Sequence, residues 1–187
     1  NTQNSIWKAN LKNEKIKTLV SGVDRFDLKR SVSALYNARD FIFSGRKIAY
    51  INNGDIWVMN SDGSYKARLT QTIEEEKDPA ISPNGRKIVY VRKNPLGNGE
   101  GIWIVSIDGS NQHKFFGNDL KRYFFPNWSS DSKRIIFGDS SVSERFATDV
   151  WSLGINKNIS PVKITPLDNY YYFSAKRSLE GKKIVFT

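Results

Sequence analysis

An Ile-Trp or Val-Trp pair recurs at a nearly constant interval along this chain. The tryptophans of these pairs are 50, 46 and 48 residues apart, at Trp7, Trp57, Trp103 and Trp151. An interval of about forty to fifty residues, built from short strands, is the sequence signature of a β-propeller blade. The repeat therefore predicts several similar small sheets around an axis, each contributing one tryptophan from the same strand.

A second motif alternates with the first on the same interval. Its best-preserved copy covers residues 78–90, where two prolines bracket one strand, Asn84-Gly85 supplies a turn and Ile88-Val89-Tyr90 begins a second strand. Each repeat then contains four strands, A to D, expected here near 78–82, 87–92, 101–107 and 112–116. Asp-Gly pairs at 62–63 and 108–109 mark the C–D turns, where we expect two-residue hairpin loops with positive φ at both central positions.

We therefore predict an all-β fold, a β-propeller of four-stranded antiparallel blades, with about four blades in a single domain over residues 1–187. The expected units are strands C and D at 5–19, blades at 37–70, 78–116 and 125–165, and strands A and B at 171–187. Two arrangements stay open. The last strand B pairs with the first strand C and closes a ring, or the chain is part of a larger ring.

The strand-C Ile-Trp pair, the Asp-Gly-Ser turn and the Ser-Pro-x-Gly-Arg-Lys hairpin together resemble the TolB-type β-propeller repeat, also called the WD40-like or PD40 repeat. The resemblance extends from Ser5 to Phe186. It implies a ring that usually has six blades, so the larger ring stays open beside a ring closed at four blades. It is unspecific for function, because similar blades occur in periplasmic TolB, in propellers of prolyl-oligopeptidase-type peptidases and in bacterial surface proteins. On resemblance alone, we expect an extracytoplasmic location.

The formal net charge of +10 raises the question of a polyanionic partner. Basic pairs recur at one hairpin position of the repeat, at 46–47, 86–87, 133–134 and 182–183, without an aromatic residue in the turn on which a base could stack. We interpret them as solvated turn positions and expect no nucleic-acid partner. No apolar run approaches the ~18 residues of a membrane span, and the absence of Cys removes disulfides and thiol chemistry.

No catalytic pattern is present, so we predict no enzymatic activity within this chain. His113 is the only histidine, and the sequence contains no Gly-x-Ser-x-Gly elbow and no Gly-rich phosphate loop. The resemblance implies that an acidic residue at Asp78 could face the channel and hold a cation. The matching positions Ala38, Phe125 and Ser174 carry no carboxylate, and calcium needs six to eight oxygen ligands. We expect no metal and no cofactor.

The four strand-C tryptophans are expected to pack in the core between blades, with their indole N–H groups bonded locally. Trp128 belongs to strand A, where it either lines the ring near the axis or packs beneath the next blade, and we expect it in the core. The B–C and D–A connections of a propeller share one face, and here they vary in length and composition, which is typical of a recognition surface. We call this the variable-loop face. Its candidate binding residues are Arg25, Arg30, Asp78, Arg92, Lys93, Arg122, Tyr123, Arg145 and Tyr170.

Two functions fit this sequence. The first is a non-catalytic scaffold that binds a protein or a glycan through the variable-loop face. The second is an accessory propeller of a larger enzyme, such as a prolyl-oligopeptidase-type peptidase or a propeller-fold lyase, with catalysis outside this chain. The absence of a starting methionine suggests that the chain is processed or cut from a longer one.

Overall fold

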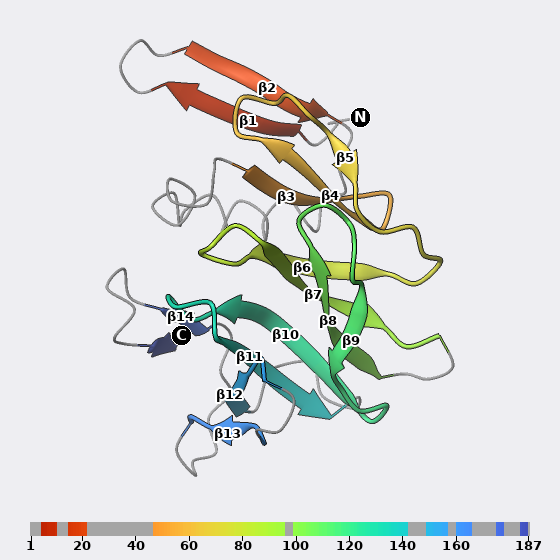
Figure 1. The fold of residues 1–187 in the computed structure, drawn as a ribbon, viewed down its shortest axis with the longest axis vertical. Helices are drawn as coiled ribbons and strands as arrows, with labels where there is room; N and C mark the ends of the chain where they lie inside the picture. The colour runs from red at the N-terminus through yellow and green to blue at the C-terminus, as the bar shows by residue number, and fades with distance from the viewer. Residues whose placement is uncertain are drawn as a thin grey trace.

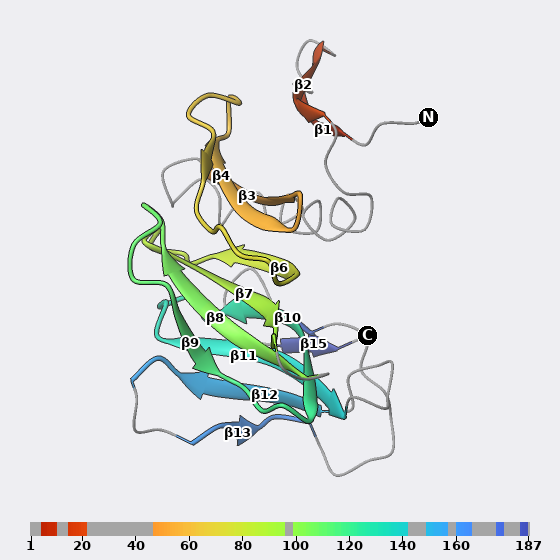
Figure 2. The ribbon, with the colours of Figure 1, turned by 90° about the vertical axis from the view of Figure 1, so that its right-hand side faces the viewer.

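A computed structural model describes residues 5–10, 15–21, 47–95, 99–141, 149–156, 160–165, 175–177 and 184–186. Every regular element within these ranges is a β-strand, and none of them contains a helix that could cross a membrane. The strands form five antiparallel sheets, and each sheet contains strands that follow one another in the sequence. Figures 1 and 2 show the sheets stacked in sequence order from the β1–β2 hairpin downward, with the β14–β15 hairpin beside the last four-stranded sheet.

Two of these sheets are complete four-stranded blades. The middle blade consists of β6 (Glu76–Ile81), β7 (Lys87–Lys93), β8 (Glu100–Ser106) and β9 (His113–Phe116). The third blade consists of β10 (Lys121–Trp128), β11 (Arg134–Ser141), β12 (Asp149–Gly154) and β13 (Val162–Lys163). Their strands correspond in order to A, B, C and D, which confirms the prediction of an all-β propeller.

The remaining sheets correspond to parts of blades. The first blade shows strands B to D, namely β3 (Lys47–Asn52), β4 (Asp55–Asn60) and β5 (Ala67–Arg68), and its expected strand A lies outside the described residues. The hairpin of β1 (Ser5–Asn10) and β2 (Lys15–Ser21) is a C–D pair, and the hairpin of β14 (Ala175–Arg177) and β15 (Ile184–Phe186) is an A–B pair. Among the described strands these two hairpins are separate sheets, so the ring-closing pair of β15 with β1 is not formed. The larger ring and the single-domain boundaries stay predictions.

Among the described residues the core lies between blades, because the sheets of the first, middle and third blades bury side chains on both of their faces. One cluster joins Ile51 and Ile56 of the first blade to Tyr90 of the middle blade, and Trp103 packs against it. A second cluster joins the middle and third blades, and Trp151 packs against it. In the middle and third blades the strand-C indole thus packs against a cluster shared with the preceding blade, as predicted for packing between blades.

The local bond predicted for the strand-C indoles is formed at Trp151, and the indole N–H of Trp128 in strand A also has an acceptor. Trp128 is 2% exposed and donates from Nε1 to the carbonyl of Ala80 in the preceding blade at 3.0 Å. Trp151 donates from Nε1 to Asp139 Oδ1 at 2.9 Å. No described residue accepts from Nε1 of Trp57 or Trp103, so the prediction of a local bond is wrong there.

Nε1 of Trp103 lacks an acceptor among the described residues because the repeat carries a different residue at the position that supplies the acceptor to Trp151. Tyr90 is the cross-strand partner of Trp103, and Phe137 is the partner of Trp151. Two residues after these aromatics stand Arg92 and Asp139 respectively. A guanidinium has no acceptor atom. Arg92 instead lies over the Trp103 ring, 4.2 Å from its centre.

The C–D turns differ from the prediction. Gly63 donates to the carbonyl of Asn60 at 2.9 Å, and only the glycine has positive φ, 88°. Such a turn is a type I turn followed by a left-handed glycine, rather than a two-residue loop with two positive φ angles. Asp62 Oδ1 accepts from the backbone N of Ser64 at 2.9 Å, which stabilises this form. Gly109, with a φ of 86°, occupies the same position in the next repeat.

Candidate functional site

The B–C and D–A connections lie together on one side of the stacked blades. In Figure 1 the described parts of these connections, around residues 53–54, 69–75, 94–95, 99 and 117–120, lie on the right-hand side. The A–B turns and the hairpin turn between β4 and β5 lie on the other side. The structure therefore groups the variable connections on one face. Each connection starts at a strand end that the sheet holds in place.

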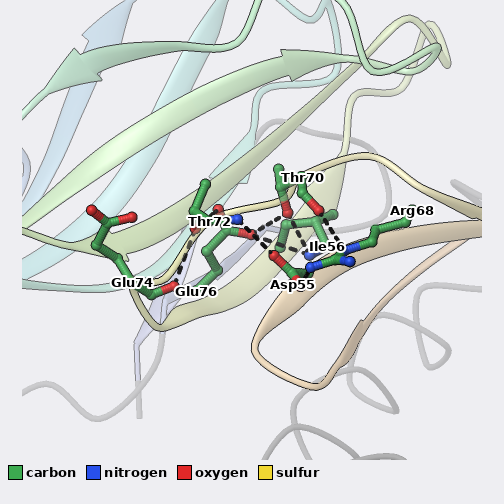
Figure 3. A network of polar contacts seen from close by, with 7 residues as sticks. All are labelled: Asp55, Ile56, Arg68, Thr70, Thr72, Glu74 and Glu76. Atoms are coloured by element: carbon green, nitrogen blue, oxygen red, sulfur yellow. Dashed lines mark hydrogen bonds and ion pairs between the residues drawn. The ribbon is translucent and has the colours of Figure 1, made fainter.

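A polar network joins the first two blades at this face (Figure 3). Asp55 accepts from Arg68 Nη2 at 2.5 Å and from the backbone N of Thr72 at 3.1 Å. Glu76, from strand A of the middle blade, accepts from the backbone N of Ile56 at 3.1 Å and from the hydroxyl of Thr70. These bonds connect strand C, strand D and the next blade, so both carboxylates have a structural role.

Burial raises the pKa of the Glu76 carboxyl above its ordinary value. The hydrogen bonds from Thr70, Ile56 and Thr72 act in the opposite direction, and the negative charge of Asp55 adds to the rise. Part of the network is repeated in the third blade. There Asp149 Oδ1 lies 2.7 Å from Lys163 Nζ, and Thr165 accepts from the backbone N of Val150 at 3.3 Å.

Glu100 connects the middle and third blades. Its Oε1 lies 2.5 Å from Lys77 Nζ, and its Oε2 accepts from the backbone N of Tyr123 at 2.8 Å. Lys77 also lies 5.4 Å from the centre of the Phe124 ring. This carboxylate thus ties strand C of one blade to strand A of its own blade and of the next.

Further ion pairs neutralise charges on the same face. Arg92 Nη2 lies 2.9 Å from Glu74 Oε2, and both side chains are largely covered. Lys121 Nζ lies 3.2 Å from Asp139 Oδ2.

The structure divides the predicted binding residues into three groups. Lys93 is exposed and Arg122 half-buried, and both lie at strand ends on the variable-loop face. Asp78, Arg92 and Tyr123 are engaged in contacts within the fold. The third group lies outside the described residues and consists of Arg25, Arg30, Arg145 and Tyr170.

The side chains of the second group make different kinds of contact within the fold. Asp78 is 6% exposed and accepts from the backbone N of Phe125. Arg92 is held by Glu74 and Trp103. The Tyr123 ring packs in the second core cluster, and burial raises its pKa to about 12. Strand β10 begins at Lys121, four residues before the expected start, so Tyr123 lies inside a strand rather than in a surface connection.

The described residues that could take part in acid–base chemistry or metal binding are not gathered into one site. His113 is exposed in the outer strand β9, with Nδ1 2.8 Å from the carbonyl of Asn111. Within the described part of the chain, no group of three or more His, Asp or Glu side chains is arranged to hold a metal ion. The basic turn positions are divided, since Arg86 and Lys133 are exposed, whereas Arg134 donates from Nε to Ser152 Oγ at 2.7 Å.

Two aliphatic residues that the sequence reasoning missed stand out on the variable-loop face. Ile73 is 98% exposed and Leu120 is 70% exposed. They lie in successive D–A connections, and each comes six residues before the strand-A proline, Pro79 or Pro126. We call Ile73 and Leu120 the two anchors. Their equal offset from that proline is the sequence signal that identifies them.

The loop that carries Leu120 is packed in place. A Cβ at Gly99 would collide with the backbone of Asp119, so the ends of the B–C and D–A connections touch there. Asn94 Nδ2 donates to Asp119 Oδ1 at 2.6 Å, and the backbone N of Leu120 donates to Asn118 Oδ1 at 2.8 Å. The exposure of Leu120 is therefore fixed by its neighbours.

Comparison with solved structures places this architecture among known folds. TolB from Acinetobacter baumannii has a TM-score of 0.65 and 16% identity, with 97% of this chain and 42% of that chain covered. The fold is a TolB-like β-propeller. A nidogen/laminin complex has a TM-score of 0.65 and 15% identity, with 98% of this chain and 63% of that chain covered. An oligogalacturonate lyase in complex with manganese has a TM-score of 0.61 and 12% identity, covering 97% and 50%.

The sequence comparisons add one relative of this propeller. A protein from Sulfurisphaera tokodaii, assigned by its name to the N-terminal subunit of a Tricorn-like protease, is 26% identical over 133 residues. The match covers 67% of this chain and 65% of that protein. No protein-family model matches the chain. The propeller thus spans less than two thirds of each of these proteins, and the structural likenesses identify the fold alone.

Proposed function

We propose that this propeller is a non-catalytic protein-binding domain that docks its partner on the variable-loop face. The observation that carries the proposal is the exposure of the two anchors, 98% for Ile73 and 70% for Leu120, at equivalent positions of successive blades. A large aliphatic side chain in water gains about 1.5–3 kcal/mol when it is fully buried. Two such side chains on one face of a rigid scaffold therefore form a nucleus for a protein interface.

The polar groups of the same face support binding rather than catalysis. Asp55, Glu76 and Glu100 each accept hydrogen bonds that connect strands or blades. Arg92 is held between an ion pair and an indole ring. The similarity to a nidogen/laminin complex supports a protein as the partner of a propeller of this kind. A glycan remains an outcome of the test.

The test compares capture by the intact chain with capture by a double variant, Ile73→Asp and Leu120→Asp. Each immobilised chain is incubated with extract of the source cells, and retained proteins are quantified. Val162→Asp is the matched control, because Val162 is 55% exposed in the outer strand β13. We expect proteins retained by the intact chain and by the control to be lost from the double variant. Equal retention by all three chains would overturn the proposal, and retention on a glycan array alone would replace the protein partner by a glycan.

An accessory role in a larger enzyme is the second candidate. The relative named as the N-terminal subunit of a Tricorn-like protease favours it, because the 133 matched residues belong to a protein that its name assigns to a protease. The same capture experiment separates the two ideas, since the accessory role requires that the retained protein, or the remainder of the parent protein, be a peptidase or a lyase. In either case we expect the chain alone to cleave neither a peptide nor an oligogalacturonate substrate.

An extracytoplasmic location is also proposed. It is supported by the structural likeness to TolB. Fractionation of source cells, followed by detection of this chain with an antibody, tests the location directly.

A further inference from the structure

The hairpin turn between β4 and β5 presents an aromatic side chain, Tyr65, to solvent. The side chain is 80% exposed, and the backbone of the residue is left-handed, with a φ of 51°. A left-handed backbone is unfavourable for a bulky residue, and such strain is concentrated at functional positions. In the described part of the chain no residue bonds the Tyr65 hydroxyl or stacks on its ring. The fold therefore gains little from an aromatic residue here.

The next repeat shows which residue suits this turn better. Asn111 stands two residues after its turn glycine, as Tyr65 does. Its φ is nearly the same, 53°, and its Nδ2 donates to Ser110 Oγ at 3.2 Å. Asn adopts the left-handed region far more readily than Tyr does. The tyrosine is thus an unfavourable choice for folding, which points to a role in binding.

The turn holds the tyrosine in a fixed position. The backbone N of Asn60 donates to the carbonyl of Ser64, and Asn60 Nδ2 donates to Ser64 Oγ, both at 2.9 Å. Ser64 Oγ itself donates to Asp62 Oδ1 at 2.7 Å. A tyrosine on such a backbone has only two side-chain torsions left to order, so it loses little conformational entropy when it binds.

The ring is isolated from other apolar side chains at the surface. The other large hydrophobic residues that are exposed in the described ranges lie outside this hairpin, and they are Ile73, Leu120 and Val162. The centre of a protein interface usually contains several apolar side chains that pack together. A single ring does not provide such a centre.

The neighbours of the ring are polar instead. Ser64 and Lys66 flank Tyr65 in the sequence, and both are exposed, as is Asp62. A pyranose sugar has one apolar face of C–H groups, about the size of an aromatic ring, and hydroxyl groups around its edge. The face stacks on an aromatic ring, and the hydroxyls exchange hydrogen bonds with Ser and Lys side chains. The surface around Tyr65 therefore fits a sugar better than a protein.

We propose that Tyr65 stacks on a pyranose ring of a glycan, at a second binding site on the side opposite the variable-loop face. The turn that carries it lies on the side of the A–B turns (Figure 1). Ser64 and Lys66 bond the sugar hydroxyls. The inference does not rest on the proposed function, because the two anchors lie on the other face. One exposed ring makes a shallow site, so we expect a dissociation constant on the order of a millimolar.

The experiment is an NMR titration of the isotope-labelled chain with tetrasaccharides of glucose, of N-acetylglucosamine and of galacturonic acid. The first two are neutral and the third is acidic, so the comparison also shows whether the sugar is charged. We expect at least one of them to shift the signals of residues 60–67 in a saturable way. If none of the three shifts these signals, the inference is wrong.

Variants at the same position separate binding from folding. Tyr65→Phe keeps the ring, so its affinity should stay within about threefold of the intact chain. Tyr65→Asn copies the next repeat and should weaken the sugar at least about tenfold. The same change should shift the unfolding equilibrium about fivefold toward the folded state, because the backbone strain is relieved. Val162→Asn is the control for loss of an exposed hydrophobic side chain, and it should leave the affinity unchanged.

Three results would overturn the inference. Equal sugar binding by Tyr65→Asn and the intact chain would show that the ring is not in the site. Lower stability of Tyr65→Asn would show that the fold itself needs the tyrosine. Loss of a captured protein from Tyr65→Asn, without sugar binding by the intact chain, would make the ring a protein contact. The Ile73→Asp and Leu120→Asp chain should bind the sugar normally, so this inference and the proposed function fail separately.

Discussion

Asp78 Oδ2 accepts a hydrogen bond from the backbone N of Phe125, 3.3 Å away, across the boundary between two blades. Both residues precede a proline, and both have left-handed backbones, with φ of 53° and 47°. Each also lies where the register of strand A shifts against strand B, which is the pattern of a β-bulge. The bulges of successive blades are therefore in contact, and a side chain from one satisfies the backbone of the other.

Replacement of Asp78 by Ala should destabilise the propeller by about 1–2 kcal/mol, because a buried backbone N–H loses its acceptor and Ala tolerates the left-handed region less well than Asp. Asp78→Asn is the matched variant, since Asn keeps an acceptor oxygen and adopts positive φ readily. We expect Asn to retain more than half of the lost stability in urea unfolding. Equal losses for Ala and Asn would show that the carboxylate charge, rather than the bond, is what matters.

Ser132 occupies a turn position that Gly85 occupies in the preceding blade, and its φ is 59°. Its Oγ accepts from the backbone N of Asn84 at 3.1 Å, which compensates for the strained backbone. Ser132→Ala removes the bond and keeps the strain, whereas Ser132→Gly removes both. We expect Ala to be less stable than Gly by about 1 kcal/mol, measured as the difference in unfolding free energy. If the Gly variant is the less stable one, the backbone at 132 is not strained.

Glu76 should make stability depend on pH. Its pKa in the folded chain is raised above its ordinary value of 4.5, so the folded state holds this proton more tightly than the unfolded state does. Its contribution to stability is therefore greatest below that ordinary value and declines as the pH rises through the raised pKa. The difference in unfolding free energy between the intact chain and Glu76→Gln should shift toward the variant between pH about 4.5 and neutrality. A difference that is constant over this range would contradict the raised pKa.

Gly99→Ala should disturb the loop that carries Leu120, because the added methyl group would collide with the backbone of Asp119. We expect weaker binding of the partner captured by the intact chain, with little change in the midpoint of urea unfolding, since the collision is confined to surface connections. Gly54→Ala is a suitable control, because a Cβ there meets no atom within 4 Å, although its φ of 80° adds local strain. Equal loss of binding in both variants would indicate a general effect of alanine in these loops.

The repeat made the strands predictable. The expected strand C near 101–107 is β8, and the expected strand B near 87–92 is β7. The Trp interval and the Pro-bracketed hairpin predicted these strands correctly because both depend on local geometry. The first reflects an indole of strand C that packs between blades, and the second reflects a turn with a fixed φ. The turn type was missed, because an Asp-Gly pair is compatible with more than one hairpin loop and the Asp side chain decided between them.

The candidate site was less predictable than the fold. A charged residue at a strand end looks accessible in a sequence, but Arg92 is covered by an ion pair with Glu74, 18 residues earlier in the chain. Such a pair depends on how two blades are placed, which no local pattern records. Ile73 and Leu120 were detectable in principle, because their offset from the strand-A proline is the same. Their exposure required the packing of the loops.

The outermost strands β5 and β13 are only two residues long, and each carries a cation, Arg68 or Lys163, that is paired back to strand C. A strand so short exposes few unpaired backbone groups to a neighbouring molecule, and a charged side chain opposes stacking of another sheet on it. At high concentration these two rims should therefore resist growth into fibrils, and any cross-β assembly would have to start from a different edge.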